Sequence, residues 1–290
     1  MSHAASSNEP LCITLGMEEV YVLLRLLHGQ EMPGLDLTPF DLDAQGIPSE
    51  SARHALAAAT NSLIAHGIAE PVNLRRAAAN DSQAQTDEPQ WKLELPAEVV
   101  ALLGTCAFGV YTLRVTLLSS NGATDTYLHE LERVGVAHTI PLAGVHKFTG
   151  LQGREGVLEY LHGLLQVGEQ QASTSSPFVV PEVTLYAARD AALAGNTGEA
   201  ARLLKDAGAV AIAEEFASAM SHARAIGSAV FAARTSNGMQ RQHQFAFVTG
   251  ATTCFIMTPG DGPGAAYQVQ QASGQHVLHR FEETLSQIRG

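Results

Sequence analysis

The sequence has few basic residues. Its 290 residues include 17 Lys and Arg against 29 Asp and Glu, which gives a formal net charge of −12. Proteins that bind nucleic acid non-specifically neutralise phosphates with a basic surface, so this balance argues against such a function. The excess is uneven, because residues 1–172 carry 9 basic and 20 acidic side chains and residues 173–290 carry 8 and 9. An acidic part would steer a basic partner, although it is also an ordinary solvated surface.

Cysteines and long apolar runs are scarce as well. Cys12, Cys106 and Cys254 are odd in number and form no C-x-x-C pair, which predicts buried thiols in a reducing compartment. No apolar stretch reaches the roughly 18 residues of a membrane helix. Residues 1–10 lack the basic start and apolar run of a signal peptide. These absences predict a cytoplasmic protein without membrane insertion.

Catalytic signatures are missing too. The sequence has no G-x-S-x-G motif and no cysteine with a histidine within an obvious site. Among its 12 histidines, His276 and His279 have the i, i+3 spacing that lets two ligands touch one ion. No third ligand lies at metal spacing, and Glu282 and Glu283 are the nearest candidates. We therefore expect no enzyme and no metal site; the alternative is a metal or small-molecule sensor, or an enzyme, that uses a histidine-rich surface.

The sequence does contain one pattern of elements that occurs twice. Apolar residues at helical spacing predict three helices in each half, at 18–27, 51–66 and 97–103 and at 183–193, 197–207 and 211–221. Four strand-like runs and a closing helix follow in each half. A repeat of order and type indicates a pseudo-two-fold protein, and we expect such a protein to present a surface to a partner.

This repeat predicts the domain organisation. The predicted segments are a disordered tail at 1–10, a first pseudo-repeat at 11–168, a hydrophilic linker at 169–177 and a second pseudo-repeat at 178–290, all in one compact domain. A different interpretation is a winged-helix regulator in residues 18–133, in which helices precede a β-wing. Only Arg53, Arg75 and Arg76 supply a basic cluster there, and the acidic balance argues against it.

The clearest strand signal belongs to a hairpin in the first half. Over residues 110–118, apolar side chains alternate with Thr112, Arg114 and Thr116, which predicts one core face and one wet face. Ser120-Asn121-Gly122 is a hairpin-type turn. The segment Ser119–Asp125 is small and polar, so we expect it to order on contact with a partner.

The order of elements also resembles a known family. A strand precedes a helix that opens with acidic residues (MEEVYVLLRLL), two helices end in a hydrophobic-Gly step (SLIAHGIAE and RLLKDAGAV), and a meander and a closing helix complete the pattern. The second half carries VPEVTLYAARDAALAG and FVTGATTCFIMTP. Over residues 11–288 this pattern resembles the EspG family, the cytosolic chaperones of ESX (type VII) secretion systems.

The resemblance implies a fold and a function. The fold is α+β, with one central antiparallel sheet flanked by helical bundles. The function is to bind helical secretion substrates, such as PE–PPE-like pairs or WXG-type proteins, to hide an apolar tip and to keep the substrate soluble until export. It needs no cofactor, and we expect the free chaperone to be a monomer or a weak homodimer.

The resemblance places binding on the sheet, its hairpin and the C-terminal bundle. Combined with the wet face of the hairpin, it predicts Arg114 as the main contact and Arg234 as its counterpart in the repeat. The alternative is that both arginines simply solvate the sheet. The predicted partner-binding set is Thr112, Arg114, Thr116, Ser119, Ser120, Asn121, Gly122, Ala123, Thr124, Asp125 and Arg234.

Overall fold

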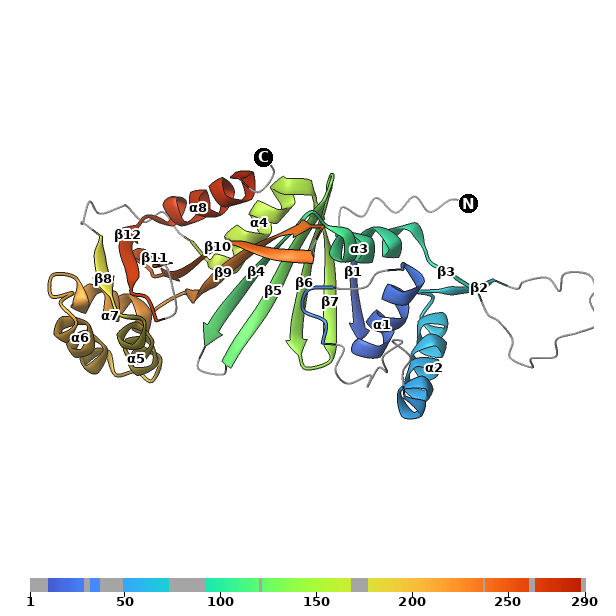
Figure 1. Ribbon diagram of the computed structural model, residues 1–290, viewed down its shortest axis with the longest axis horizontal. Coiled ribbons are helices and arrows are strands. Elements are labelled where there is room, and N and C mark those ends of the chain that lie inside the picture. The colour runs from blue at the N-terminus through green and yellow to red at the C-terminus, as the bar shows by residue number, and fades with distance from the viewer. Residues whose placement is uncertain are drawn as a thin grey trace, which may run out of the picture.

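One antiparallel sheet organises the structure. The computed structural model describes residues 10–28, 32–36, 49–72, 92–119, 122–167, 177–236, 238–260 and 264–287. Within them, ten strands form a single sheet in the order β1-β7-β6-β5-β4-β9-β10-β11-β12-β8, and β2 and β3 form a separate pair. The order is symmetrical about the central β4–β9 pair (Figure 1). Pseudo-two-fold symmetry requires such an order; the duplication itself stays a prediction.

The first half contains the three predicted helices, the meander and the closing helix. Its elements are β1 (Cys12–Gly16), α1 (Met17–Leu26), α2 (Glu50–Ala65), β2 (Glu70–Val72), β3 (Lys92–Glu94), α3 (Ala97–Phe108), β4 (Tyr111–Ser119), β5 (Gly122–Leu131), β6 (Val134–Leu142), β7 (Val145–Gln152) and α4 (Gly153–Leu165). The predicted tail and linker lie outside the described residues, apart from Pro10 and Pro177.

The second half has the same order of elements without a counterpart of the β2–β3 pair. Its elements are β8 (Phe178–Val180), α5 (Glu182–Leu193), α6 (Thr197–Asp206), α7 (Ala213–Ser221), β9 (Ala225–Thr235), β10 (Gly238–Thr249), β11 (Cys254–Pro259), β12 (Tyr267–Ala272) and α8 (Gly274–Gln287). Among the described residues no helix is both long and apolar enough to cross a bilayer.

Helix ends follow local sequence signals. The Ser49 hydroxyl accepts a hydrogen bond from the Ala52 amide at the start of α2 (3.3 Å), as an N-cap serine does. Gly67 follows this helix with φ of 68°, a left-handed conformation in which glycine has no Cβ to clash. Pro96 and Pro181 are the N-caps of α3 and α5. Pro96 therefore lies one position before the first helical residue, Ala97.

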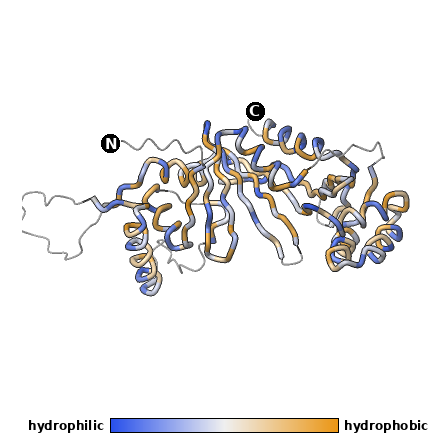
Figure 2. The backbone as a smooth tube through the Cα atoms, turned by 180° about the vertical axis from the view of Figure 1, so that it is seen from behind, coloured by the Kyte–Doolittle hydropathy of each residue, from blue (hydrophilic) through white to orange (hydrophobic). Residues whose placement is uncertain are grey.

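Helices cover the two faces of the sheet differently. On the first face, α4 and α8 pack over a cluster that includes Phe247. The next residue, Val248, points to the second face, because strand side chains alternate, and it packs under α5, α6 and α7. At the other end of that second face, α1, α2 and α3 cover a cluster that includes Val136. The second face thus carries two helical bundles at opposite ends of the molecule (Figures 1 and 2).

The pairing of β4 with β9 joins the two halves. Seven residue pairs run from Tyr111 opposite Ala233 to Leu117 opposite Gly227. A Cβ at Gly227 would lie 2.1 Å from the Thr116 carbonyl oxygen. The close approach of the two strands at this point therefore requires glycine.

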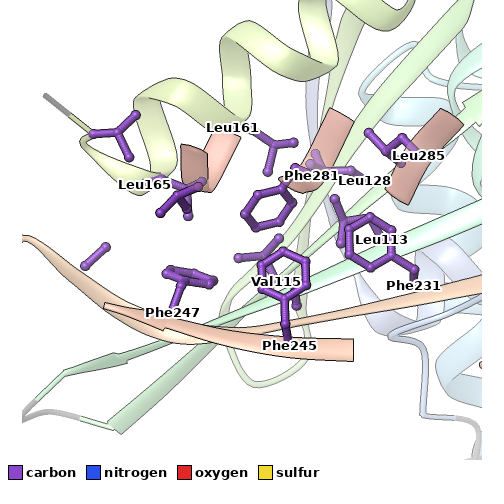
Figure 3. Packing of buried hydrophobic residues seen from close by; sticks show 14 of the residues in the cluster. Leu113, Val115, Leu128, Leu161, Leu165, Phe231, Phe245, Phe247, Phe281 and Leu285 are labelled. Atoms are coloured by element: carbon purple, nitrogen blue, oxygen red, sulfur yellow. The ribbon is translucent and has the colours of Figure 1, made fainter. Parts of the chain in front are cut away.

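Aromatic rings hold α8 on the first face of the sheet. The Phe281 ring lies 4.8 Å from the Phe245 ring and 5.9 Å from those of Phe231 and Phe247, measured between centroids (Figure 3). All four side chains are at most 3% exposed. Removing such a buried ring leaves a cavity that its neighbours refill only in part.

We predict that Phe281→Ala lowers the free energy of unfolding by about 3–5 kcal/mol, because the protein loses both the burial of the ring and the packing around it. Urea denaturation followed by circular dichroism measures the change. Leu142→Ala is the control: Leu142 is 68% exposed, so its loss should stay within about 0.5 kcal/mol. Equal stability of the two variants would contradict the packing described for α8.

Candidate functional site

The middle of the second face is open between the two bundles. We call this surface the central face; its residues are Arg114, Thr116 and Leu118 on β4, Asp125 and Tyr127 on β5, Ser228, Val230 and Ala232 on β9, and Gln244 and Ala246 on β10. All of them are exposed or half-buried, whereas Leu113 and Phe231, which point to the first face, are fully buried. The strands thus present an accessible surface between the two bundles, apart from the Tyr127 ring, on which the segment around Gly34 packs.

Arg114 lies at the centre of a polar network on this face. Its Nη2 and Nε atoms donate to the two carboxylate oxygens of Asp125 at 2.6 and 3.1 Å, and the Thr116 hydroxyl donates to the same carboxylate at 2.6 Å. The guanidinium carbon is 5.9 Å from the Tyr127 ring centroid. The hydrogen bond to Asp125 raises the pKa of Arg114. Its side chain remains 47% exposed, so it is positioned and still accessible.

A side-chain hydrogen bond joins β4 and β5 at the hairpin turn next to this network. The Ser119 hydroxyl donates to the Gly122 carbonyl oxygen at 3.1 Å, and Gly122 has φ of 119°, which glycine adopts without strain. Ala123 and Thr124 are exposed. The predicted contacts Ser120 and Asn121 lie outside the described residues.

Thr112 is not on the wet surface that the sequence pattern predicted. It is 5% exposed, and its hydroxyl lies 3.0 Å from Nδ1 of His129, which is buried beside it. The alternation itself is correct, since Thr112 points to the same face as Arg114. The prediction of exposure fails because Thr112 packs beside the buried His129 of the neighbouring strand, which a pattern within one strand does not reveal.

Arg234 lies in a different environment from Arg114. The residue opposite Arg114 on β9 is Val230, and Arg234 lies at the far end of that strand. Its Nη2 and Nε atoms donate to the carbonyl oxygens of Ala107 (2.6 Å) and Gly109 (3.2 Å). These carbonyls are at the C-terminal end of α3, where a cation stabilises unpaired acceptors. Arg234 therefore ties the second hairpin to the N-terminal bundle.

A groove forms the C-terminal wall of the central face. It has a volume of about 240 Å³ and runs between α5 and strands β9 and β10. Its lining is largely apolar and includes Leu118, Leu185, Met220, Ile226, Val230, Ala246 and Met257. Sequence reasoning missed this groove, because its walls come from separate elements that only the tertiary fold brings together.

Two tyrosines and an arginine form the polar rim of the groove. The Tyr186 and Tyr267 hydroxyls are 3.3 Å apart, and the Tyr186 hydroxyl donates to Glu182 at 2.8 Å. The hydrogen bond to Tyr267, with burial and Glu182 as further causes, raises the pKa of Tyr186. The Arg189 guanidinium carbon lies 5.0 Å from the Tyr186 ring centroid. The rim therefore supplies two hydroxyls and the guanidinium of Arg189, which is paired with Asp190 at 2.7 Å, around an apolar floor.

Exposed apolar side chains surround this end of the molecule. Val179 on the edge strand β8 is 62% exposed, and Val183 in the first turn of α5 is 76% exposed. Val210, between α6 and α7, is 66% exposed. Single exposed apolar residues are ordinary; of these three, Val183 is on α5, the helix that lines the groove.

The described residues hold no group of three or more His, Cys, Asp and Glu side chains placed to bind a metal ion. On α8, His279 Nε2 lies 3.0 Å from a Glu283 oxygen and its Nδ1 lies 3.6 Å from a Glu282 oxygen, so both candidate carboxylates lie beside this histidine. Three other histidines, His129, His138 and His146, are buried against the sheet. They are interior residues and form no histidine-rich surface.

Comparison with solved structures finds the same architecture in a secretion chaperone. The Mycobacterium tuberculosis type VII secretion system chaperone EspG5, solved in complex with a PE25–PPE41 dimer, matches with a TM-score of 0.56 and 10% identity over 92% of this chain and 93% of that chain. The chain has an EspG-like fold. No protein-family model and no curated protein matches the sequence. At 10% identity the likeness concerns the fold, and it confirms the predicted α+β architecture with a central antiparallel sheet.

The EspG-like fold excludes the winged-helix arrangement. In this fold β4 and β5 are interior strands, bordered by β9 and β6, so they do not form a free wing beside a helical DNA-binding unit. Arg75 and Arg76 lie outside the described residues, and Arg53 is exposed on α2.

The two arginines lead to a prediction about stability. Arg234→Ala should lower the free energy of unfolding by about 1–3 kcal/mol, because it leaves two carbonyl acceptors without their charged donor. Arg114→Ala should cost at most about 1 kcal/mol, since it removes an exposed ion pair. Urea denaturation of both variants measures the difference. If Arg114→Ala destabilised the protein more than Arg234→Ala, the assignment of Arg234 as the structural arginine would be wrong.

Proposed function

We propose that this chain is a non-enzymatic cytoplasmic chaperone that binds a helical secretion substrate, such as a PE–PPE-like pair or a WXG-type protein. The observation that carries the proposal is the open central face with its apolar groove on an EspG-like fold. The solved chaperone with this fold was captured with a PE25–PPE41 dimer. The acidic overall charge of −12 agrees with a protein partner better than with a nucleic acid.

The groove suits the apolar end of a helical hairpin. A helix is about 10–12 Å wide with its side chains, so its tip is able to place one or two apolar side chains on the floor formed by Leu118, Val230 and Ala246. Burying such side chains stabilises a complex by about 25 cal/mol for each Å² of apolar surface removed from water. Val183, which is 76% exposed, lies on α5, the helix that also supplies the lining residues Leu185 and Tyr186.

The polar part of the central face supplies orientation. The Arg114–Asp125 pair and Thr116 hold donors and acceptors in fixed positions, which limits the entropy lost when a partner binds. We include Ser119 and the exposed residues Gly122, Ala123 and Thr124 in the surface, since the hairpin that they form lies next to this network. The groove would thus provide affinity, and the hairpin would fix the direction of the substrate.

The geometry favours a protein over a small molecule as the occupant. Pockets that enclose a drug-sized ligand measure about 300–1,000 Å³, and this groove is smaller and continuous with the open central face. A thermal-shift screen with nucleotides and divalent metals tests the sensor alternative. A large shift with one of them would support that alternative, and we expect none.

The first binding prediction concerns the groove. Ala246→Arg should weaken binding to PE–PPE-like pairs encoded in the same genome by at least about tenfold, or about 1.4 kcal/mol, because a charged side chain fills the apolar floor. Isothermal titration calorimetry measures the dissociation constant. Ala187→Arg is the matched control, since Ala187 is exposed on α5 and does not line the groove. Equal affinities of the two variants would exclude the groove as the docking site.

The second binding prediction concerns the hairpin network. Arg114→Glu should also weaken binding about tenfold, because it removes the exposed cation and places a second carboxylate beside Asp125. Arg133→Glu makes the same change of charge in the exposed turn at the opposite end of the hairpin and should leave affinity unchanged. Binding within about threefold of the wild type in Arg114→Glu would show that Arg114 only solvates the sheet.

A further inference from the structure

A stack of buried histidines forms the N-terminal wall of the central face. His129, His138 and His146 lie on neighbouring strands and are at most 2% exposed. The His138 ring centroid is 6.2 Å from that of His129 and 5.1 Å from that of His146. Tyr127 and Phe148 pack against His138 at 5.5 and 4.6 Å. Titratable rings are thus buried in positions that apolar side chains usually occupy.

The hydrogen bond between His138 and His146 requires at least one neutral ring. His138 Nε2 and His146 Nδ1 are 2.9 Å apart, so one ring must accept the N–H of the other, and protonation of both would oppose two donors. His129 Nε2 is buried and has no hydrogen-bond partner among the described residues. If all three rings were protonated, the His138–His146 hydrogen bond would lose its acceptor nitrogen. The added charge on His129 would have no hydrogen-bond partner at Nε2 within the described part of the chain.

Charged groups around the stack do not compensate for protonation. Arg234 on β9 acts on His129, and the two outer rings act on His138. No carboxylate of the described residues lies in ion-pair contact with any of the three rings. Burial lowers the pKa of all three histidines, that of His129 to about 3.

A short segment after α1 covers the stack. A Cβ on Gly34 would lie 2.6 Å from the Tyr127 ring, so the segment Met32–Asp36 packs directly on that ring. The Pro33 backbone lies against His138, where it favours the protonated ring but does not outweigh burial. Met32 is 4% exposed and packs in the cluster of the N-terminal bundle. The segment thus connects that bundle to the histidine stack.

We propose that protonation of the histidine stack releases the segment Met32–Asp36, which makes the N-terminal wall of the central face acid-sensitive. A released histidine has an ordinary pKa of about 6.5, above its value in the closed state. The open state therefore binds more protons below pH 6.5, and the closed state loses stability as the pH falls. A freed ring whose pKa in the closed state lies well below 5, as that of His129 does, raises the equilibrium constant for release of the segment by about 25-fold between pH 7 and pH 5. The proposal holds whether or not the chain binds a secretion substrate.

Hydrogen–deuterium exchange of the intact protein at pH 7 and pH 5, corrected for the chemical exchange rate, tests this proposal. The Leu35 amide donates to the Met32 carbonyl oxygen at 3.1 Å, so peptides containing Leu35 should lose protection by at least about 25-fold. Peptides from α5, α6 and α7 are the internal control, because the core cluster beneath them contains no histidine, and they should change by less than about threefold. Equal changes in both regions, or no change around Leu35, would overturn the proposal.

A double variant identifies the titrating groups. His138→Phe with His146→Leu replaces both rings by apolar side chains beside Phe148 and Leu15, which are already buried. The acid-induced loss of protection around Leu35 should be smaller than in the wild type, because only His129 remains to titrate in the stack. Full retention of the pH effect would show that these histidines are not its cause. If the variant fails to fold, hydrogen–deuterium exchange of the wild-type protein at pH 7 and pH 5 still tests whether the segment is released in acid.

Discussion

The backbone pairing between β4 and β9 is the contact on which the rest of the structure depends. It is where strands of the two halves pair, and it turns two five-stranded units into one ten-stranded sheet. The approach is closest at Gly227, where a side chain would meet the Thr116 carbonyl. Because both strands end in hairpins, each hairpin reaches the bundle of the other half: Leu118 packs in the C-terminal cluster, and Arg234 caps α3.

This arrangement explains why the second face has an open centre. The closing helices α4 and α8 both pack on the first face, whereas the three-helix bundles lie near the two ends of the sheet on the other side. A surface of Thr, Ser, Gln and one bidentate Arg–Asp pair remains between them, with an apolar groove at one wall and a histidine stack at the other. Polar strands bounded by an apolar pocket are suited to a partner that presents a helical tip with a polar flank.

Much of this fold follows from the sequence, because its signals are local. The 3.6-residue spacing in 183–193 and the alternation in 110–118 each depend on neighbouring residues, and both elements form as predicted. The three-residue strands β2 and β8 were missed, since so short a run shows no period and only pairing defines it. The burial of Thr112, the capping role of Arg234 and the groove depend on segments distant in sequence. Register across β4 and β9, which a single sequence does not reveal, decides which residue faces Arg114.

The central claim is that a helical substrate docks on the central face and its groove. Site-specific photo-crosslinking tests it most directly, with benzoylphenylalanine placed at Tyr186 on the rim of the groove or at His279, which is 61% exposed on α8 on the first face. With a PE–PPE-like pair from the same genome, the account predicts a crosslinked product from position 186 and none from position 279. A crosslink from position 279 alone would place the partner on the helical side of the sheet and contradict the account.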